Sequence, residues 1–265
     1  REIKKNKKKS IFPFSRNRHI EPEENTTMAN VKPDTSMQQY IDQLKLEDET
    51  TDSIFGRDLL EAFKLSNHFY ENRAIPSICY RCLDYLVKTG AIYEEGIFRL
   101  SGSASTIRQL KDQFNTHFDL DLFESNLKPD IHTVSGLLKT YLRELPSPIL
   151  GQNCYQHLNN VILHNNLSAA STATIFRDYF NDPANVDVVH YNTCYTIFKL
   201  LTHIIANSQS NRMNLRNVCI VFVPTLNISL EVLSIFLIDF SCIFENGSPV
   251  PDHKREVLDL HIPNF

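Results

Sequence analysis

Residues 188–206 read VVHYNTCYTIFKLLTHIIA, and this stretch decides the fold class. Glycine and proline do not occur in it, so no residue of the stretch interrupts a helix. The spacing predicts the longest helix of the chain, because the large apolar side chains recur three or four positions apart, as on one helix face: Val188, Tyr191, Tyr195, Phe198, Leu201 and Ile205.

The same periodicity continues through most of the chain from Phe55 onward. Shorter helices are expected after Ser103 and over 133–145. The helices that should form the core are expected over four ranges: 75–90, 188–206, 213–223 and 230–245.

Single residues mark where these helices should begin and end. Thr133 and Ser229 are predicted N-caps, because a hydroxyl oxygen there accepts a hydrogen bond from the first turn. Gly90 is predicted to end the helix over 75–90, and Pro224 to terminate the helix over 213–223. Neither a period-2 stretch nor an Asn-Gly turn indicates a hairpin, so we predict a single all-α domain.

Composition narrows the classes of function. The 265 residues are 42% hydrophobic and 22% charged, which is typical of a soluble globular protein. The densest apolar run, 232–244, is broken by Ser234, Asp239 and Ser241, which excludes a membrane span. The seven glycines complete no standard phosphate-binding loop and no serine-hydrolase elbow. The chain therefore brings no standard nucleotide site of its own.

Cysteine and histidine do not indicate a metal site. Cys79 and Cys82 have CxxC spacing, but no second pair completes a zinc set, so we expect packed thiols. The ten histidines show no ligand spacing and no nucleophile has a paired base, so no metal is expected and a self-contained hydrolase is disfavoured. Because no signal peptide is evident, we expect reduced thiols and a cytoplasmic location.

Charge is divided unevenly in the N-terminal part. Residues 1–20 carry eight Lys and Arg against one Glu, a net charge of +7, and residues 21–54 carry a net charge of −7. Such blocks bury little apolar surface, so residues 1–53 are predicted to be a largely disordered tail or linker with a short helix over 37–46. Nucleic acid is not an expected partner, because the rest of the chain is acidic.

The basic block has a second interpretation besides a solvated linker. Lysines near an anionic leaflet are attracted to it, so the block could recruit the protein to the inner face of the plasma membrane. The lysines that would contact lipid are Lys4, Lys5, Lys7, Lys8 and Lys9.

A single arginine, Arg99, stands between two glycines in the stretch AIYEEGIFRLSGS, residues 91–103. Apolar residues flank it on both sides and can pin the loop to a core. An arginine on an anchored loop is a fixed cation with five hydrogen-bond donors. The alternative is an ordinary surface arginine that pairs with Glu94 or Glu95.

Two further positions place polar residues on otherwise apolar helices. Lys139 and Arg143 are four residues apart, so both cations should project from one side of 133–145, opposite its apolar stripe. A solvated helix face is the alternative there. Asn217 lies in the apolar stretch 215–223, where a buried amide needs partners. It either ties the core together or lies at the domain edge and bonds to another molecule.

Three blocks of this sequence together resemble a known family. EGIFRLSGS (95–103), LLKTYLRELPSPIL (137–150) and RMNLRNVCIVFVPTL (212–226) are similar, in order and spacing, to the motif blocks of the RhoGAP domain. This domain is an all-α GTPase activator for Rho-family small G proteins. The resemblance, which looks strongest to fungal members, assigns residues 54–246 to the domain and leaves 247–265 as a C-terminal extension.

The resemblance also implies roles for the residues noted above. Arg99 matches the family's catalytic arginine finger, which enters the active site of the partner. Lys139 and Arg143 match the block that lies under the finger loop and beside the switch regions of the G protein. Asn217 matches the asparagine that hydrogen-bonds at the switch surface, and Pro224 follows at the expected place.

The implied partner is a GTP-bound Rho-family small G protein. That partner carries the GTP and the Mg²⁺, so the resemblance implies an activator without a cofactor of its own rather than an enzyme. The alternative function is a non-catalytic module of the same fold that binds G proteins or lipids, and the presence of Arg99 argues against it. Val223 departs from the family pattern, because many members have glycine or another small residue there.

Overall fold

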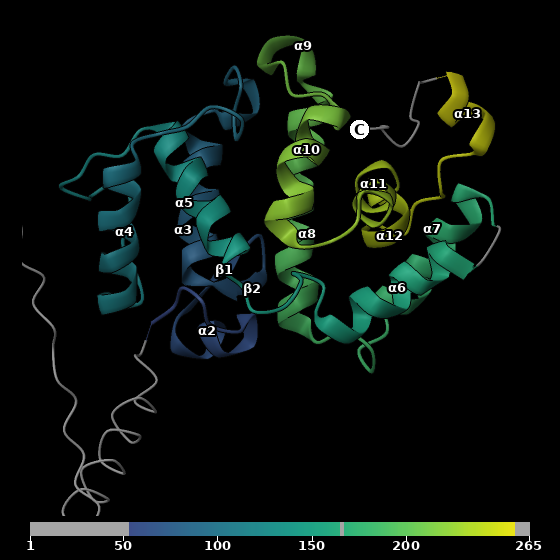
Figure 1. Cartoon of the computed structure of the whole chain (residues 1–265), viewed down its shortest axis with the longest axis horizontal. Helices are drawn as coiled ribbons and strands as arrows, with labels where there is room; N and C mark the ends of the chain where they lie inside the picture. Colours follow the sequence, from purple (N-terminus) through teal and green to yellow (C-terminus); the bar gives the residue numbers. More distant parts are fainter. Residues whose placement is uncertain (1–52, 165–166, 258–265) are drawn as a thin grey trace, which may run out of the picture. The chain divides into compact units, whose positions relative to one another are not determined.

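Helix α8, Val188–Ala206, packs against elements from both halves of the folded chain (Figure 1). The structure is a computed structural model and describes residues 53–164 and 167–257. α8 is the longest helix among these residues, so the prediction for 188–206 is confirmed. The predicted helix over 37–46 and the lysines of the basic block lie outside the described residues.

The all-α class is confirmed. The elements before α8 are α2 (Leu59–Leu65), β1 (Asn67–Tyr70), β2 (Arg73–Pro76), α3 (Ser77–Lys88), η1 (Ala91–Tyr93), α4 (Ala104–His117), α5 (Ile131–Arg143), α6 (Gln152–His164) and α7 (Ala169–Phe180). Those after it are α9 (Ser208–Asn211), α10 (Leu215–Leu226), α11 (Leu230–Ile238), α12 (Phe240–Phe244) and α13 (Asp252–Val257). Within the described residues, α3, α5, α8, α10 and α11 supply most of the core.

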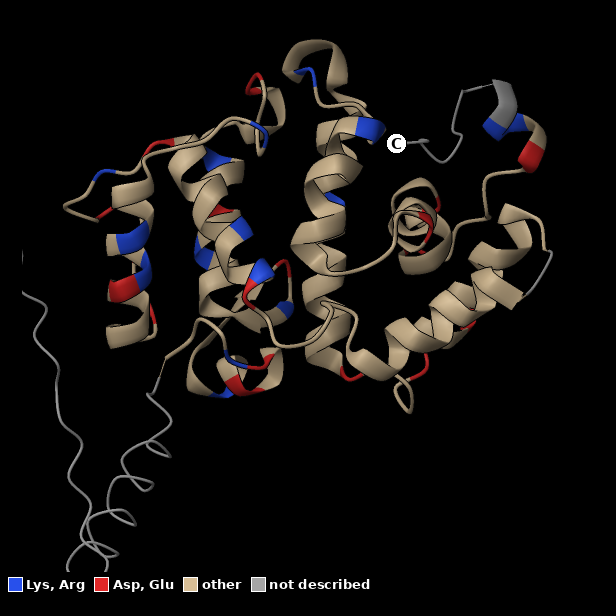
Figure 2. Cartoon of the chain, viewed as in Figure 1, with Lys and Arg blue, Asp and Glu red and all other residues tan. Residues whose placement is uncertain are grey.

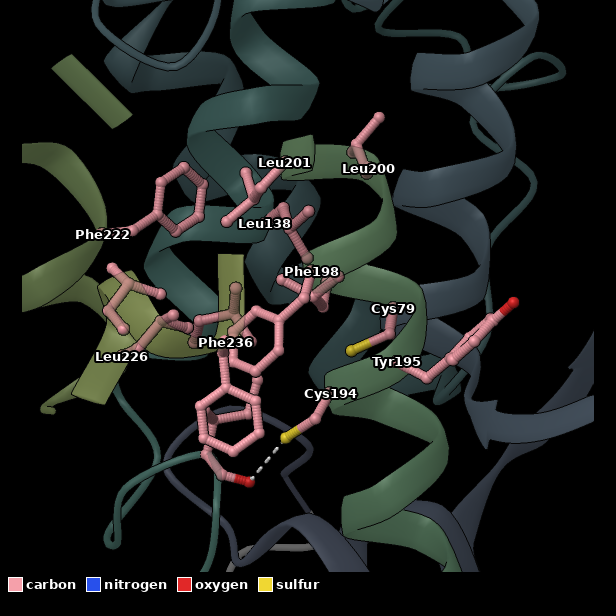
Figure 3. Packing of buried hydrophobic residues seen from close by; sticks show 14 of the residues in the cluster. Cys79, Leu138, Cys194, Tyr195, Phe198, Leu200, Leu201, Phe222, Leu226 and Phe236 are labelled. Atoms are coloured by element: carbon pink, nitrogen blue, oxygen red, sulfur yellow. Dashed lines mark hydrogen bonds between the residues drawn. The ribbon is translucent and has the colours of Figure 1, made fainter. Parts of the chain in front are cut away.

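Large aromatic and aliphatic side chains fill the centre of the fold (Figure 3). Phe198 of α8 packs on Phe236 of α11, with their ring centroids 5.2 Å apart. Leu138 of α5 and Phe222 of α10 are also buried. Burying side chains of this size contributes about 1.5–3 kcal/mol each, so the contacts of α8 with α10 and α11 stabilise the fold.

One two-stranded hairpin was not predicted. β1 and β2 pair antiparallel from Asn67 opposite Pro76 to Tyr70 opposite Arg73. The turn residues Glu71 and Asn72 have φ angles of 47° and 62°, the left-handed region that this turn type requires. Glutamate is unusual in that position, so the turn lacks the Asn-Gly pattern that would have indicated it.

Several helix ends differ from the predictions. α5 begins at Ile131, and its N-cap is Asp130, whose carboxylate accepts a hydrogen bond from the amide of Thr133 at 2.7 Å. The prediction that Thr133 caps this helix was therefore wrong. The predicted cap Ser229 and the predicted end at Gly90, where φ is 81°, are confirmed. The helix expected after Ser103 is α4, and Ser103 is its N-cap.

The prediction that Pro224 terminates its helix was also wrong. α10 continues to Leu226 and ends where Asn227 adopts a left-handed φ of 54°. A proline so near the helix end removes one amide donor only, and the helix tolerates that loss.

The predicted helix over 230–245 is interrupted at Asp239, which separates α11 from α12. The Asp239 side chain is fully buried and needs hydrogen-bond partners there. The Arg255 guanidinium contacts both of its carboxylate oxygens at 2.6 Å, and the amide of Val250 donates to one of them at 2.8 Å. Residues 247–257, in the predicted C-terminal extension, thus contact the helical domain.

Candidate functional site

Arg99 lies on a tight loop, residues 94–103, which we call the Arg99 loop. The amides of Arg99 and Leu100 both donate to the carbonyl of Gly96, at 2.9 and 2.8 Å. Phe98 has a φ of 64° and is buried, and its ring packs edge-on against Phe222 with centroids 5.0 Å apart. Because Phe98 points inward from this turn, Arg99 and Leu100 are exposed on its outer side.

A buried asparagine that the sequence analysis missed holds the first part of the Arg99 loop. The amide of Gly96 donates to the carbonyl of Asn211 at 2.8 Å. The side chain of Asn211 donates to the carbonyls of Ile92 and Ile204, both at 2.8 Å, and accepts from the amide of Met213 at 2.7 Å. Both the nitrogen and the oxygen of the Asn211 side chain are thus hydrogen-bonded within the protein. Through these bonds Asn211 joins the Arg99 loop to α8 and to the residues just before α10.

The first turn of α5 holds the end of the Arg99 loop. Gly102 packs so closely on α5 that a Cβ atom there would lie 2.2 Å from the backbone nitrogen of Thr133. The Thr133 hydroxyl accepts a hydrogen bond from the amide of Ser103 at 3.1 Å. On the other side of the loop, His132 Nε2 lies 3.1 Å from a carboxylate oxygen of Glu94. Only glycine fits at position 102, which explains the second glycine of the motif.

Lys139 lies under the Arg99 loop. Its ammonium group donates a hydrogen bond to the carbonyl of Phe98, the residue before Arg99. The side chain is half-buried, and this burial lowers the pKa of Lys139, with Arg143 nearby lowering it further. Lys139 therefore supports the loop backbone rather than lying open on a helix face.

Arg99 and Arg143 are exposed, and neither forms an ion pair with any described residue. Glu94 contacts His132 instead, and Glu144, next to Arg143, binds the ammonium group of Lys111 at 2.6 and 2.7 Å. The alternative of a surface pair between Arg99 and Glu94 or Glu95 is therefore not found among the described residues. Two uncompensated guanidinium groups remain on one side of the domain.

Asn217 lies at the domain edge rather than in the core. It is half-buried, and its side-chain nitrogen donates to the carbonyl of Arg212 at 2.8 Å. Its backbone amide donates to the side chain of Asn214, the N-cap of α10, at 2.9 Å. This geometry favours the second of the two alternatives for Asn217. Among the described residues, the side-chain oxygen of Asn217 has no hydrogen-bond partner.

Pro224 is exposed near the end of α10 and borders an apolar hollow. Cys219, Ile220 and Val223 line the rest of this hollow, which has a volume of about 260 Å³. Val223 is half-buried, so its extra bulk relative to glycine forms part of the hollow wall. α10 packs on α5 and on the Arg99 loop, so the three sequence blocks meet in space.

Comparison with known proteins settles the family. The family model described as the RhoGAP domain matches residues 76–230. The chain belongs to the RhoGAP family. GTPase-activating protein BEM3 of Saccharomyces cerevisiae is 41% identical over 225 residues, which cover 80% of this chain and 20% of that protein. The protein of the same name from Eremothecium gossypii is 35% identical over 293 residues, which cover 100% of this chain and 28% of that protein.

This chain thus spans less than a third of the length of these relatives. The crystal structure of human Rho GTPase activating protein 15 matches 81% of this chain and 100% of that chain, with a TM-score of 0.61. At 24% sequence identity, this match shows that the two proteins share a fold.

The cysteine thiols of this RhoGAP domain are packed inside it. All six cysteines are buried free thiols, as the sequence analysis predicted, and burial raises the pKa of Cys154 to about 12. Among residues 53–164 and 167–257, no group of three His, Cys, Asp or Glu side chains could hold a metal ion. The same residues include no helix long and apolar enough to cross a membrane.

Proposed function

We propose that this domain stimulates GTP hydrolysis by a Rho-family small G protein and that Arg99 enters the partner's active site as an arginine finger. The observation that carries the proposal is an exposed, unpaired guanidinium on a loop whose backbone is fixed from three sides. Membership of the RhoGAP family, and relatives named GTPase-activating proteins, support the activator role.

The chemistry of phosphoryl transfer explains what such an arginine would add. Negative charge develops on the oxygens around the transferred phosphate, and catalysis depends on positioning and on neutralising this charge. The G protein would supply GTP, Mg²⁺ and the attacking water. Arg99 would add a second cation in a site that docking shields from water, where its charge has a larger effect. In GTPases an arginine finger accelerates hydrolysis by roughly 10³- to 10⁵-fold.

The contacts of the Arg99 loop give this finger a defined starting position. Asn211, Lys139 and Thr133 each hold a backbone atom of the loop, so little conformational freedom is lost when Arg99 enters the site. Arg143, Asn217 and Pro224 would then contact the partner around the finger. Recruitment from the cytoplasm to a membrane through Lys4, Lys5, Lys7, Lys8 and Lys9 stays a prediction.

Single-turnover GTP hydrolysis by a panel of purified Rho-family G proteins tests the proposal. The wild-type domain should accelerate hydrolysis by at least one of them, and Arg99→Ala should reduce the acceleration at least 100-fold. Arg99→Lys should rescue little, because an ammonium group lacks the planar fork that spans two oxygens. Arg177→Ala is a matched control, since Arg177 is an arginine of α7 that pairs with Asp178.

Binding to the GTP-loaded G protein separates this proposal from the alternative of a non-catalytic module. Arg99→Ala should still bind, because the docking contacts of Arg143 and Asn217 remain. A wild-type domain that binds the G protein without accelerating hydrolysis would favour the alternative. Acceleration that Arg99→Ala leaves unchanged would contradict the role of the finger.

A further inference from the structure

The corner between α9 and α10 holds an arginine in an unusual backbone conformation. Arg212 follows α9 with φ 62° and ψ 19°, and its amide donates to the carbonyl of Ser208 at 2.9 Å. Helices commonly end in this left-handed conformation, but glycine or asparagine usually occupies it, because a longer side chain is strained there. At this position the sequence has an exposed arginine instead.

A second arginine occupies an unfavourable position four residues later. Arg216 lies in the first turn of α10, directly after the N-cap Asn214 and Leu215, and that turn contains no acidic residue. The N-terminal end of a helix carries partial positive charge, so a cation there is repelled and an anion would be favoured. The choice of arginine at 216 therefore also disfavours the local structure.

Neither arginine has a carboxylate partner among the residues that the structure describes. Some other cations of the domain are paired, for example Arg81 with Asp119 and Lys199 with Glu71. Both Arg212 and Arg216 are exposed instead. Arg212 and Arg216 thus each disfavour the local structure, and no ion pair within the domain offsets this cost. Residues of this kind are typical of a binding surface.

Hydrogen bonds join the corner to groups that the proposed function uses. Figure 2 shows the lysines and arginines of the domain in blue. The carbonyl of Arg212 accepts the side-chain hydrogen bond of Asn217 at 2.8 Å. Asn211, the residue before Arg212, accepts the hydrogen bond from Gly96 in the Arg99 loop. A partner that received Arg99 and touched Asn217 would thus lie beside Arg212, and Arg216 is the exposed residue next to Asn217 in the first turn of α10.

We propose that Arg212 and Arg216 form a cationic docking corner that binds acidic side chains of the GTP-loaded G protein at the edge of its nucleotide site. This inference rests on the proposed function, and it adds the chemistry of the contact: carboxylates on the partner opposite two guanidinium groups. Charges at the rim of an interface act mainly on association rate and on its salt dependence. The corner therefore contributes to docking, whereas Arg99 contributes to the chemical step.

Two substitutions separate docking from folding, because each should stabilise the domain. Arg212→Asn replaces arginine with a residue suited to the left-handed conformation, and Arg216→Glu places an anion at the helix N-terminus. Each should raise the Tm by roughly 1–4 °C. Each should also weaken binding to the GTP-loaded G protein by about 2- to 10-fold at low salt, and the effect should shrink at higher ionic strength.

Kinetics distinguish this inference from the proposed function. For Arg212→Asn the loss of stimulation should appear in the KM for the GTP-loaded G protein, whereas Arg99→Ala should lower the rate at saturation. Arg177→Asn is the control for removing an arginine far from the corner, and its binding should match wild type. A domain that binds through the corner but does not stimulate hydrolysis would contradict the proposed catalysis and leave this inference standing.

Two results would overturn the docking corner. One is unchanged affinity and unchanged salt dependence in the double variant Arg212→Asn/Arg216→Glu. The other is a Tm that falls together with affinity, since that would make both arginines structural. Absence of binding between the wild-type domain and every G protein of the panel would overturn the inference together with the proposed function.

Discussion

Arg99 and Arg255 are the same kind of side chain in opposite settings. Arg255 is buried, and its guanidinium contacts both carboxylate oxygens of Asp239 at 2.6 Å. Arg99 is exposed, without an ion pair in the described chain, and the protein holds its backbone rather than its charged group. An arginine whose charge is satisfied inside the fold is structural. An arginine without an ion pair, on a loop whose backbone is held in place, is available to bind another molecule.

The comparison predicts that substitution of Arg255 affects stability and substitution of Arg99 does not. Arg255→Met leaves the buried carboxylate of Asp239 unpaired, which should cost about 3–5 kcal/mol. The Tm should fall by roughly 6–20 °C. Differential scanning calorimetry of Arg255→Met and of Arg99→Ala measures this contrast, and Arg99→Ala should unfold within about 1–2 °C of wild type.

A double variant checks the cause. In Asp239→Leu/Arg255→Met no charge remains buried, so much of the lost stability should return. A double variant as unstable as Arg255→Met would show that the unpaired carboxylate of Asp239 is not what destabilises Arg255→Met.

Asn211 is buried like Arg255, but it supports the Arg99 loop, so its substitution should affect both stability and stimulation. Asn211→Ala leaves the carbonyl of Ile92 and the amide of Met213 without the hydrogen bonds that this side chain supplies, at a cost of about 1–3 kcal/mol. GTP hydrolysis at saturating G protein should also slow by about 10-fold, because the loop loses its fixed position.

Asn181→Ala is the matched control for Asn211→Ala. The side chain of Asn181 also joins distant segments, donating to the carbonyl of Ile243 at 2.7 Å, but it lies on the α7 side of the domain. Asn181→Ala should lower the Tm by less than Asn211→Ala, because Asn181 is exposed, and stimulation per folded molecule should stay at the wild-type level. Equal losses of stimulation in both variants would contradict a specific role for Asn211.

The smallest effect is expected at Arg81, a second structural arginine. Arg81 binds the carboxylate of Asp119 at 2.8 and 2.9 Å, and His68 contacts it at 2.9 Å. The hydrogen bond from Arg81, more than that from His68, lowers the pKa of Asp119 to about 2. Because this pKa is below its usual value of 3.8, the stabilisation is fully present above pH 4 and is lost as the pH falls towards 2.

The Tm of Asp119→Asn should therefore lie below that of wild type at pH 6, by a few degrees, and approach it near pH 2. Thermal melts of both proteins across this range measure the difference. A difference that stays constant with pH would mean that the Asp119 charge does not contribute to stability.

Local signals in the sequence predicted much of this fold and of the site. Helix spacing identified α8 and α4, and the hydroxyl cap Ser229 identified the start of α11. The Arg99 loop was found because its two glycines and its arginine are close in the sequence. Such features depend on residues within a few positions of each other, so a short stretch of sequence includes every residue that takes part in them.

Interactions between distant residues could not be predicted in this way. The pair Asp239–Arg255 joins residues 16 positions apart, and the amide of Asn211 reaches Ile92 across 119 positions. Asn211 resembles any polar residue of a short loop, so no signal marked it as an anchor. The strain at Arg212 and the turn at Glu71 depend on backbone angles that these residue types rarely adopt.

The central claim is that Arg99 acts on the transition state of a partner's reaction. Its most direct test is the affinity of the domain for a Rho-family G protein loaded with GDP and aluminium fluoride, which imitates the transferred phosphate, relative to the same protein loaded with GTP. Wild type should bind the transition-state form at least 100-fold more tightly, and Arg99→Ala should bind the two forms almost equally. A preference for the transition-state form that persists in Arg99→Ala would contradict the account.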